Sequence, residues 1–259
     1  MFRYEEPIFQ KKRLLRIEML EQLRDYPRNY LKLQYQGYSD GIVCGCQISW
    51  DSGQLEIAPG ILYHAGNLYF MEEAHRMECL AEDKMRYLKV QFMTEVHEEG
   101  KIEGSTRIVL NDRRPDAACE MELCRFRLQE GARLRDTYEN FEDYATEYDT
   151  VNRIHVPYAS YGQATIWPAI LKQFAEEILE TNNKNVYDVS FAMNILANQG
   201  VVSAECVCSY LNMRLERKKT ENGNQSSMYR DLQEVLSQEK TGRTFRSGEN
   251  EKQRSVILW

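Results

Sequence analysis

The sequence lacks a long hydrophobic run. None of its 259 residues lies in a stretch approaching the roughly 18 apolar residues that suggest a membrane span. The first residues, MFRYEEPIFQKKRLL, include early acids and no apolar run long enough for a signal peptide. We therefore expect no membrane partner, and a protein that is cytoplasmic when made.

Excess positive charge is also missing. The 33 Lys and Arg residues are outnumbered by 40 Asp and Glu residues, which gives a net charge of −7. Nucleic-acid-binding domains usually carry a basic footprint, so the balance argues against a general nucleic-acid partner. It suits a protein that works against other proteins. Hydrophobic residues make up 42% of the chain, enough to bury a core.

The motifs that mark common catalytic and nucleotide sites are absent. The sequence contains no GxxxxGK[ST] phosphate loop, no GxGxxG turn, no GxSxG elbow and no HExxH pair. The four histidines, His64, His75, His97 and His155, are scattered. We therefore expect no catalytic residue, no cofactor and no enzymatic activity. A site assembled from distant Cys, His and Asp residues stays open as an alternative.

Metal-ligand spacing is missing as well. The seven cysteines are an odd number and form no CxxC pair or Cys/His array of the kind that binds zinc. The acidic segment 136–149 lacks the glycine and terminal glutamate of a calcium loop. We expect reduced, mostly buried thiols and no metal.

What the sequence does contain is a series of short strands joined by turns. Ile42, Cys44, Cys46 and Ile48 alternate with other residues at the period of a half-buried strand. Asp51-Ser52-Gly53 and Ala65-Gly66-Asn67 are turn signals, and the second suits positive φ. Further strands are expected at residues 77–80, 86–95, 106–110 and 120–128. Together they predict an antiparallel β sandwich or barrel over residues 30–136.

A helical arm is expected before the β domain, over residues 1–29. Residues 7–26 carry an apolar side that includes Leu14, Ile17 and Leu20, and Pro27 is expected to limit this helix. Residues 30–35 alternate like a strand. The neighbouring Lys and Arg residues are interpreted as a solvated face.

The second half changes to a helical period. An acidic and aromatic linker is expected at 137–164, a helical domain at 165–240 and a mobile tail at 241–259. Thr165, Asp188 and Ser203 are candidate N-caps, and Gly200 is placed to end the second helix. A fourth helix is expected over residues 227–240. The whole chain is thus predicted to be α+β.

Residues 186–216 have the outline of a helix-turn-helix, which leaves a DNA-binding regulator as an alternative function. The second helix, however, would begin with Ser203-Ala204-Glu205-Cys206 rather than with basic or amide side chains. Arg214 comes late in it. An αα-hairpin that packs on its neighbours is the favoured interpretation.

The stretch 41–69 resembles the attachment domains of bacteriophage tail-fibre and baseplate-associated proteins. It contains Gly-Ile-Val-x-Gly, then Leu-x-Ile-x-Pro-Gly-Ile, then Gly-x-Leu-Tyr. Residues 123–131, LCRFRLQEG, run on to Leu134-Arg135-Asp136, which is similar to the later strand of that pattern. The likeness covers residues 31–136, and the helical second half departs from the long shafts of tail fibres.

The resemblance implies a structural component of a phage tail, prophage or contractile-injection baseplate. Such a virion component acts as an adaptor between other tail or baseplate proteins, and we expect it to be a homo-oligomer within the assembled particle. The residues expected to bind partners are apolar side chains on the arm, the β domain and the tail: Leu14, Ile17, Leu20, Tyr63, Tyr69, Ile257, Leu258 and Trp259.

Overall fold

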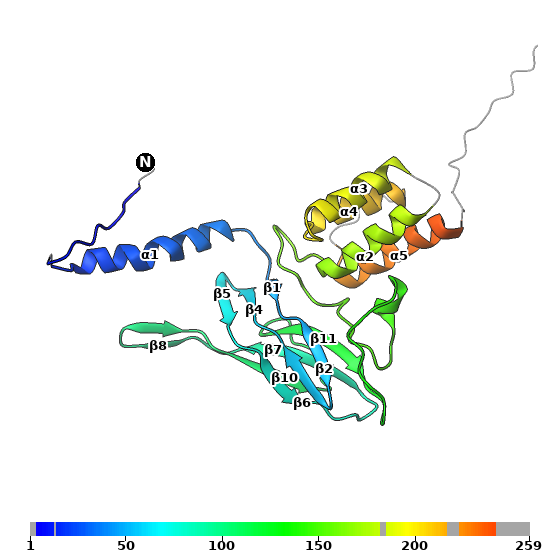
Figure 1. Cartoon of the computed structure of the whole chain (residues 1–259), viewed down its shortest axis with the longest axis horizontal. Coiled ribbons are helices and arrows are strands. Elements are labelled where there is room, and N and C mark those ends of the chain that lie inside the picture. Colours follow the sequence, from blue (N-terminus) through cyan, green and yellow to red (C-terminus); the bar gives the residue numbers. More distant parts are fainter. Residues whose placement is uncertain (1–3, 13, 182–184, 217–222, 242–259) are drawn as a thin grey trace, which may run out of the picture.

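The computed structural model describes residues 4–12, 14–181, 185–216 and 223–241. Helix α1 (Ile17–Gln34) comes first, small antiparallel sheets follow, and further helices form the C-terminal part (Figure 1). The predicted α+β class is therefore confirmed. The tail after residue 241 lies outside the described residues.

The β lobe consists of three small sheets and a hairpin, all antiparallel. The first sheet has the order β1 (Gly41–Gly45), β4 (Gly60–His64), β5 (Asn67–Met71). The second has the order β2 (Ile48–Asp51), β3 (Gln54–Ile57), β6 (His75–Glu78). The third has the order β10 (Thr106–Asn111), β7 (Met85–Phe92), β11 (Glu120–Arg127). The hairpin pairs β8 (Val96–Glu98) with β9 (Lys101–Glu103).

Two tight turns set the register of the first two sheets. Ser52 and Gly53 have φ values of 51° and 85°, and Ala65 and Gly66 have 48° and 83°. Two successive residues with positive φ match the right-handed twist of the strands that they join. Both turns were expected from the sequence, and both are confirmed. Ile42, Leu55 and Ile57 of the adjoining strands are completely buried.

The arm differs from the sequence expectation. Helix α1 begins at Ile17 and continues through Pro27 to Gln34, so the prediction of a helix at 7–26 and a strand at 30–35 was wrong. The apolar stripe does not stop at Pro27, because Tyr30 and Leu33 continue it at helical spacing. Pro27 cannot donate a backbone hydrogen bond, and its ring crowds the carbonyl of Leu23 one turn earlier, so it weakens the helix without ending it.

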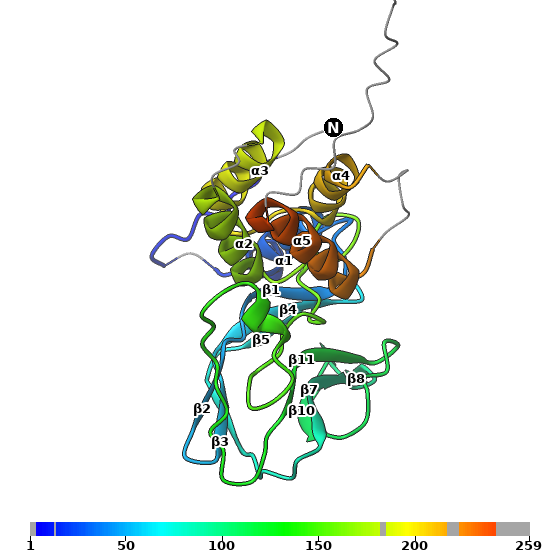
Figure 2. The ribbon, with the colours of Figure 1, turned by 90° about the vertical axis from the view of Figure 1, so that its right-hand side faces the viewer.

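The helical lobe follows a short 3₁₀ turn, η1 (Glu142–Ala145). Its helices are α2 (Pro168–Glu180), α3 (Val186–Ala197), α4 (Ala204–Arg214) and α5 (Gln225–Thr241). Figure 2 shows them gathered over one end of the β lobe. Their core is aromatic, with Phe191 stacked on Tyr210 at 4.0 Å and Phe141 on Tyr229 at 4.8 Å between ring centroids.

The predicted helix ends are partly confirmed. The Ser203 hydroxyl accepts a hydrogen bond from the backbone N–H of Cys206, and Gly200 has a φ of 83° just after α3. Thr165 and Asp188 are not caps. The helix that Thr165 was expected to start begins at Pro168, and Asn185 caps α3 by accepting from the N–H of Tyr187. Thr165 and Asp188 are instead buried in the lobe.

One buried guanidinium joins the two lobes. Arg153 is 1% exposed and lies 4.0 Å from the centre of the Trp167 ring, at the start of α2. It donates hydrogen bonds to the backbone carbonyl of Cys46 (3.1 Å) and to Oε1 of Gln47 (3.2 Å) in the β lobe. Burial lowers the pKa of Arg153, because removal from water disfavours the charged form of the guanidinium. A single side chain thus holds the β1–β2 connection against the helical lobe.

We predict that Arg153→Ala destabilises the protein by about 3 kcal/mol, because two hydrogen bonds from a charged donor and a desolvated cation–π contact are lost together. Calorimetry should show a lower Tm and separate transitions for the two lobes. Arg133→Ala, at an exposed arginine, is the control. An unchanged, single transition for Arg153→Ala would show that this contact does not couple the lobes.

Candidate assembly interface

Helix α1 stands away from the rest of the protein (Figure 1). None of its residues is buried. Large apolar side chains are exposed along its length, among them Leu23 (57%), Tyr26 (62%) and Leu33 (70%). Exposed apolar surface of this kind is typical of interaction sites, including contacts between proteins.

An aromatic cluster holds the base of α1 on the β lobe. Tyr35, directly after the helix, stacks on Tyr63 of β4 at 5.8 Å and meets Tyr38 edge-on at 5.1 Å. Tyr38 in turn contacts Tyr161 at 6.5 Å. Four rings from distant parts of the sequence therefore fix where the helix leaves the body. No sequence spacing links Tyr35 and Tyr38 to Tyr63 and Tyr161, because these two pairs of rings meet only through the fold.

The predicted partner-binding residues lie in three parts of the chain: the arm, the β lobe and the C-terminal tail. Leu14, Ile17 and Leu20 are exposed on the arm, where a partner can reach them. Tyr63 is 8% exposed and serves the aromatic cluster, so it offers little surface to a partner. Tyr69 is half-buried, with its ring edge-on to Phe92. Ile257, Leu258 and Trp259 lie outside the described residues.

The β lobe exposes apolar residues that sequence reasoning did not select. Phe70 on β5 is 59% exposed, and Val96 and Ile102 on the β8–β9 hairpin are exposed as well. In Figure 1 this hairpin and α1 extend to the same side of the body. The alternating side-chain pattern of β5 and the short β8–β9 hairpin are the sequence features that could have identified these exposed residues. These side chains are further exposed apolar groups that do not belong to the arm.

The helix-turn-helix alternative gains no support from the geometry of α3 and α4. Arg214 does not face solvent but pairs with Asp188, Nε to Oδ1 at 2.6 Å, and with Glu239 of α5. The Tyr210 hydroxyl donates a second hydrogen bond to Asp188, at 2.8 Å. The N-terminal turn of α4 presents the acidic, exposed Glu205. Arg214 thus holds the helices together and is not placed to contact phosphate.

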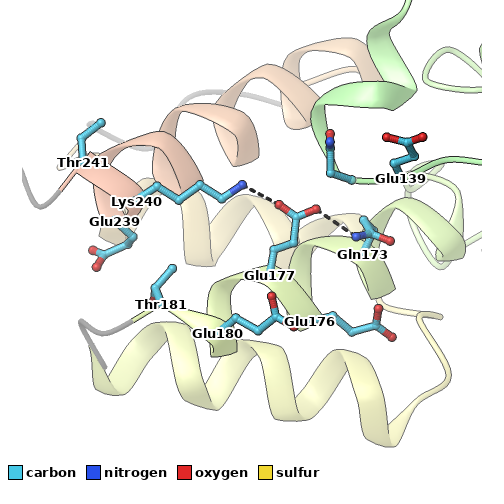
Figure 3. Close-up of a pocket in the computed structure, with 10 residues that line it drawn as sticks. Glu139, Gln173, Glu176, Glu177, Glu180, Thr181, Glu239, Lys240 and Thr241 are labelled. Carbon is cyan, nitrogen blue, oxygen red and sulfur yellow. Dashed lines mark hydrogen bonds and ion pairs between the residues drawn. The ribbon is translucent and has the colours of Figure 1, made fainter.

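An open, acidic cleft of about 770 Å³ lies between α2 and α5 (Figure 3). Lys240 crosses it to Glu177 at 2.7 Å, and Gln173 donates to the same carboxylate at 2.9 Å. Burial alone would raise the pKa of Glu177. Hydrogen bonds from Lys240, Gln173 and the backbone N–H of Phe141 outweigh burial and hold the pKa below its ordinary value. The ion pair between Lys240 and Glu177 therefore connects α5 to α2 across the cleft.

Across the residues that the structure describes, no group of three or more His, Cys, Asp or Glu side chains is arranged to hold a metal ion. In the same part of the chain, no helix combines the length and apolar character needed to cross a membrane.

The likeness to known proteins is weak and is confined to solved structures. No family model matches the sequence, and no curated protein matches it. Among solved structures, that of TssK, a type VI secretion baseplate protein, superposes with a TM-score of 0.37 and 10% sequence identity. The superposition covers 90% of this chain and 71% of that one. A TM-score at this level does not establish a shared fold.

The ion pair in the cleft predicts a pH dependence. Because the folded-state pKa of Glu177 is lowered, its carboxylate stabilises the fold above the unfolded pKa of about 4.3 and loses this contribution as the pH falls through the folded value. Glu177→Gln should cost about 1 kcal/mol at pH 7, and the deficit should shrink in acid. Urea unfolding at several pH values measures this.

The control for that experiment is Glu180→Gln, which removes an exposed carboxylate of the same cleft. It should leave stability within about 0.5 kcal/mol of the unaltered protein at each pH. A deficit for Glu177→Gln that stays constant down to pH 3 would contradict the assignment.

Proposed function

We propose that this chain is a non-enzymatic structural component of a phage tail, prophage or contractile-injection baseplate, acting as an adaptor between other proteins of the assembly. The observation that carries the proposal is α1, an amphipathic helix that has no buried residue and exposes several large apolar side chains. The kind of assembly comes from the resemblance of residues 31–136 to attachment domains of tail and baseplate proteins.

Helix α1 is too weak to be stable by itself. Pro27 divides its 18 residues into two segments, each shorter than the roughly 12–15 residues at which isolated helices become marginal in water. A proline inside a helix also costs about 3 kcal/mol relative to alanine. Most helices in proteins are stabilised by packing of an apolar face, and none of the residues of α1 is buried by the part of the chain that the structure describes. A partner surface supplies what is missing.

The rest of the molecule can hold α1 in a fixed position. Arg153 locks the two lobes together, and the aromatic cluster around Tyr35 and Tyr63 fixes the base of α1. A fixed base lowers the entropy that docking would otherwise lose, so the arm is presented in a defined direction. Buried apolar contact between proteins, with no chemical step, is the mechanism proposed.

The proposal predicts that the arm recruits the chain into the assembly. Co-expressed with tail, sheath and baseplate proteins encoded by neighbouring genes, the full chain should sediment with them in a high-mass particle. Leu20→Glu places a charge on the apolar side of the arm and should reduce incorporation at least tenfold. A tenfold loss corresponds to about 1.4 kcal/mol, less than the value of one buried leucine.

Lys32→Glu is the matched control, since it introduces the same side chain on the polar side of the same helix. It should be incorporated like the unaltered chain. A chain that remains separate from all of these proteins, or equal losses for both variants, would refute the proposed role.

A further inference from the structure

Five apolar residues of α1 follow a seven-residue repeat; four of them are exposed and Met19 is half-buried. Met19, Leu23, Tyr26, Tyr30 and Leu33 are spaced by four, three, four and three positions. This spacing places the five residues in one line along the helix, which we call the seam. It is the spacing by which one helix packs lengthwise against another in a coiled coil.

The charges of α1 all lie away from the seam. Its six charged residues occupy the three heptad positions on the outer side of the helix: Glu18, Glu21, Arg24, Asp25, Arg28 and Lys32. The five positions of α1 that flank the seam are taken by uncharged residues: Leu20, Gln22, Pro27, Asn29 and Gln34. A helix laid along the seam therefore meets no charge from α1.

This distribution points to the identity of the partner. Coiled coils that choose a different chain do so through opposite charges at the flanking positions, and like charges there prevent a helix from pairing with its own copy. Helix α1 has neither attraction toward a charged partner nor repulsion toward itself. We propose that the seam binds the seam of a second copy of this chain.

The inference specifies the homotypic contact within the proposed assembly, and it rests on the proposed function in taking α1 as the docking element. Self-pairing would cover the side chains left exposed on the single chain, including Leu23, Tyr26 and Tyr30. It would also supply the packing that Pro27 makes necessary. Because the seam is short, the association is weak, with a Kd of about 1–100 μM.

The test is sedimentation equilibrium of the full chain from about 1 to 200 μM, spanning the expected Kd. The unaltered chain should shift from monomer to oligomer as its concentration rises. The double variant Leu23→Glu/Tyr30→Glu puts charges into the seam and should weaken association at least tenfold. Both residues are exposed in the single chain, so circular dichroism and Tm of the body should not change.

Arg28→Glu is the control on the outer side of α1. It changes the net charge by the same amount as the double variant, yet it should associate like the unaltered chain. A monomer at every concentration overturns the inference. So does an oligomer that the seam variant leaves intact, or one that both variants weaken equally.

The same variants separate this inference from the proposed function. A chain that stays monomeric alone but still sediments with tail and baseplate proteins loses the homotypic seam and keeps the adaptor role. A chain that self-associates through the seam and ignores those proteins keeps the seam and loses the role. Tenfold weaker self-association with unchanged capture of the tail proteins supports the seam as the contact between copies.

Discussion

The buried guanidinium of Arg153 is the contact on which the arrangement of the two lobes depends. The segment that carries it connects the β lobe to the helices, and its side chain returns to the β1–β2 connection while its face lies on Trp167. An unpaired buried charge is unfavourable unless hydrogen bonds and an aromatic face compensate for the lost water. The compensation exists only when both lobes are in place. Because hydrogen bonds and a cation–π contact require particular atoms to meet, this contact favours one relative position of the lobes. A purely apolar contact is less directional.

The two lobes are held in one arrangement, and α1 makes few contacts with either of them. Helix α1 leaves the β lobe at the cluster formed by Tyr35, Tyr38 and Tyr63, and its apolar side faces away from any core of its own chain. The two features belong together. If the lobes moved relative to each other, α1 would not be held in one direction. If the apolar side of α1 were packed on its own chain, no apolar surface of the arm would remain for a neighbouring protein. This division between a fixed body and an incomplete helix is what an assembly component requires.

Several elements could be predicted from the sequence because their causes are local. Ser52-Gly53 and Ala65-Gly66 form turns because small residues adopt positive φ, and Ser203 caps α4 because its hydroxyl reaches an amide three residues on. Asp188 shows the limit of this reasoning. Its position near a helix start favoured a cap, but Asn185 takes that role and Asp188 pairs with Arg214, which lies 26 residues further along. No local pattern marks the partner of a buried charge.

The amino-acid sequence by itself determined the class of the fold, two of its hairpin turns and the apolar residues of the arm, since hydrophobic period and turn chemistry act over a few residues. Only the tertiary structure decided which apolar residues remain exposed. Both Tyr63 and Leu20 were predicted to contact a partner. In the structure Tyr63 is buried and stacks on Tyr35, whereas Leu20 is exposed to solvent. The physical reason is that burial depends on what the rest of the chain brings against a side chain, and that neighbour comes from elsewhere in the fold.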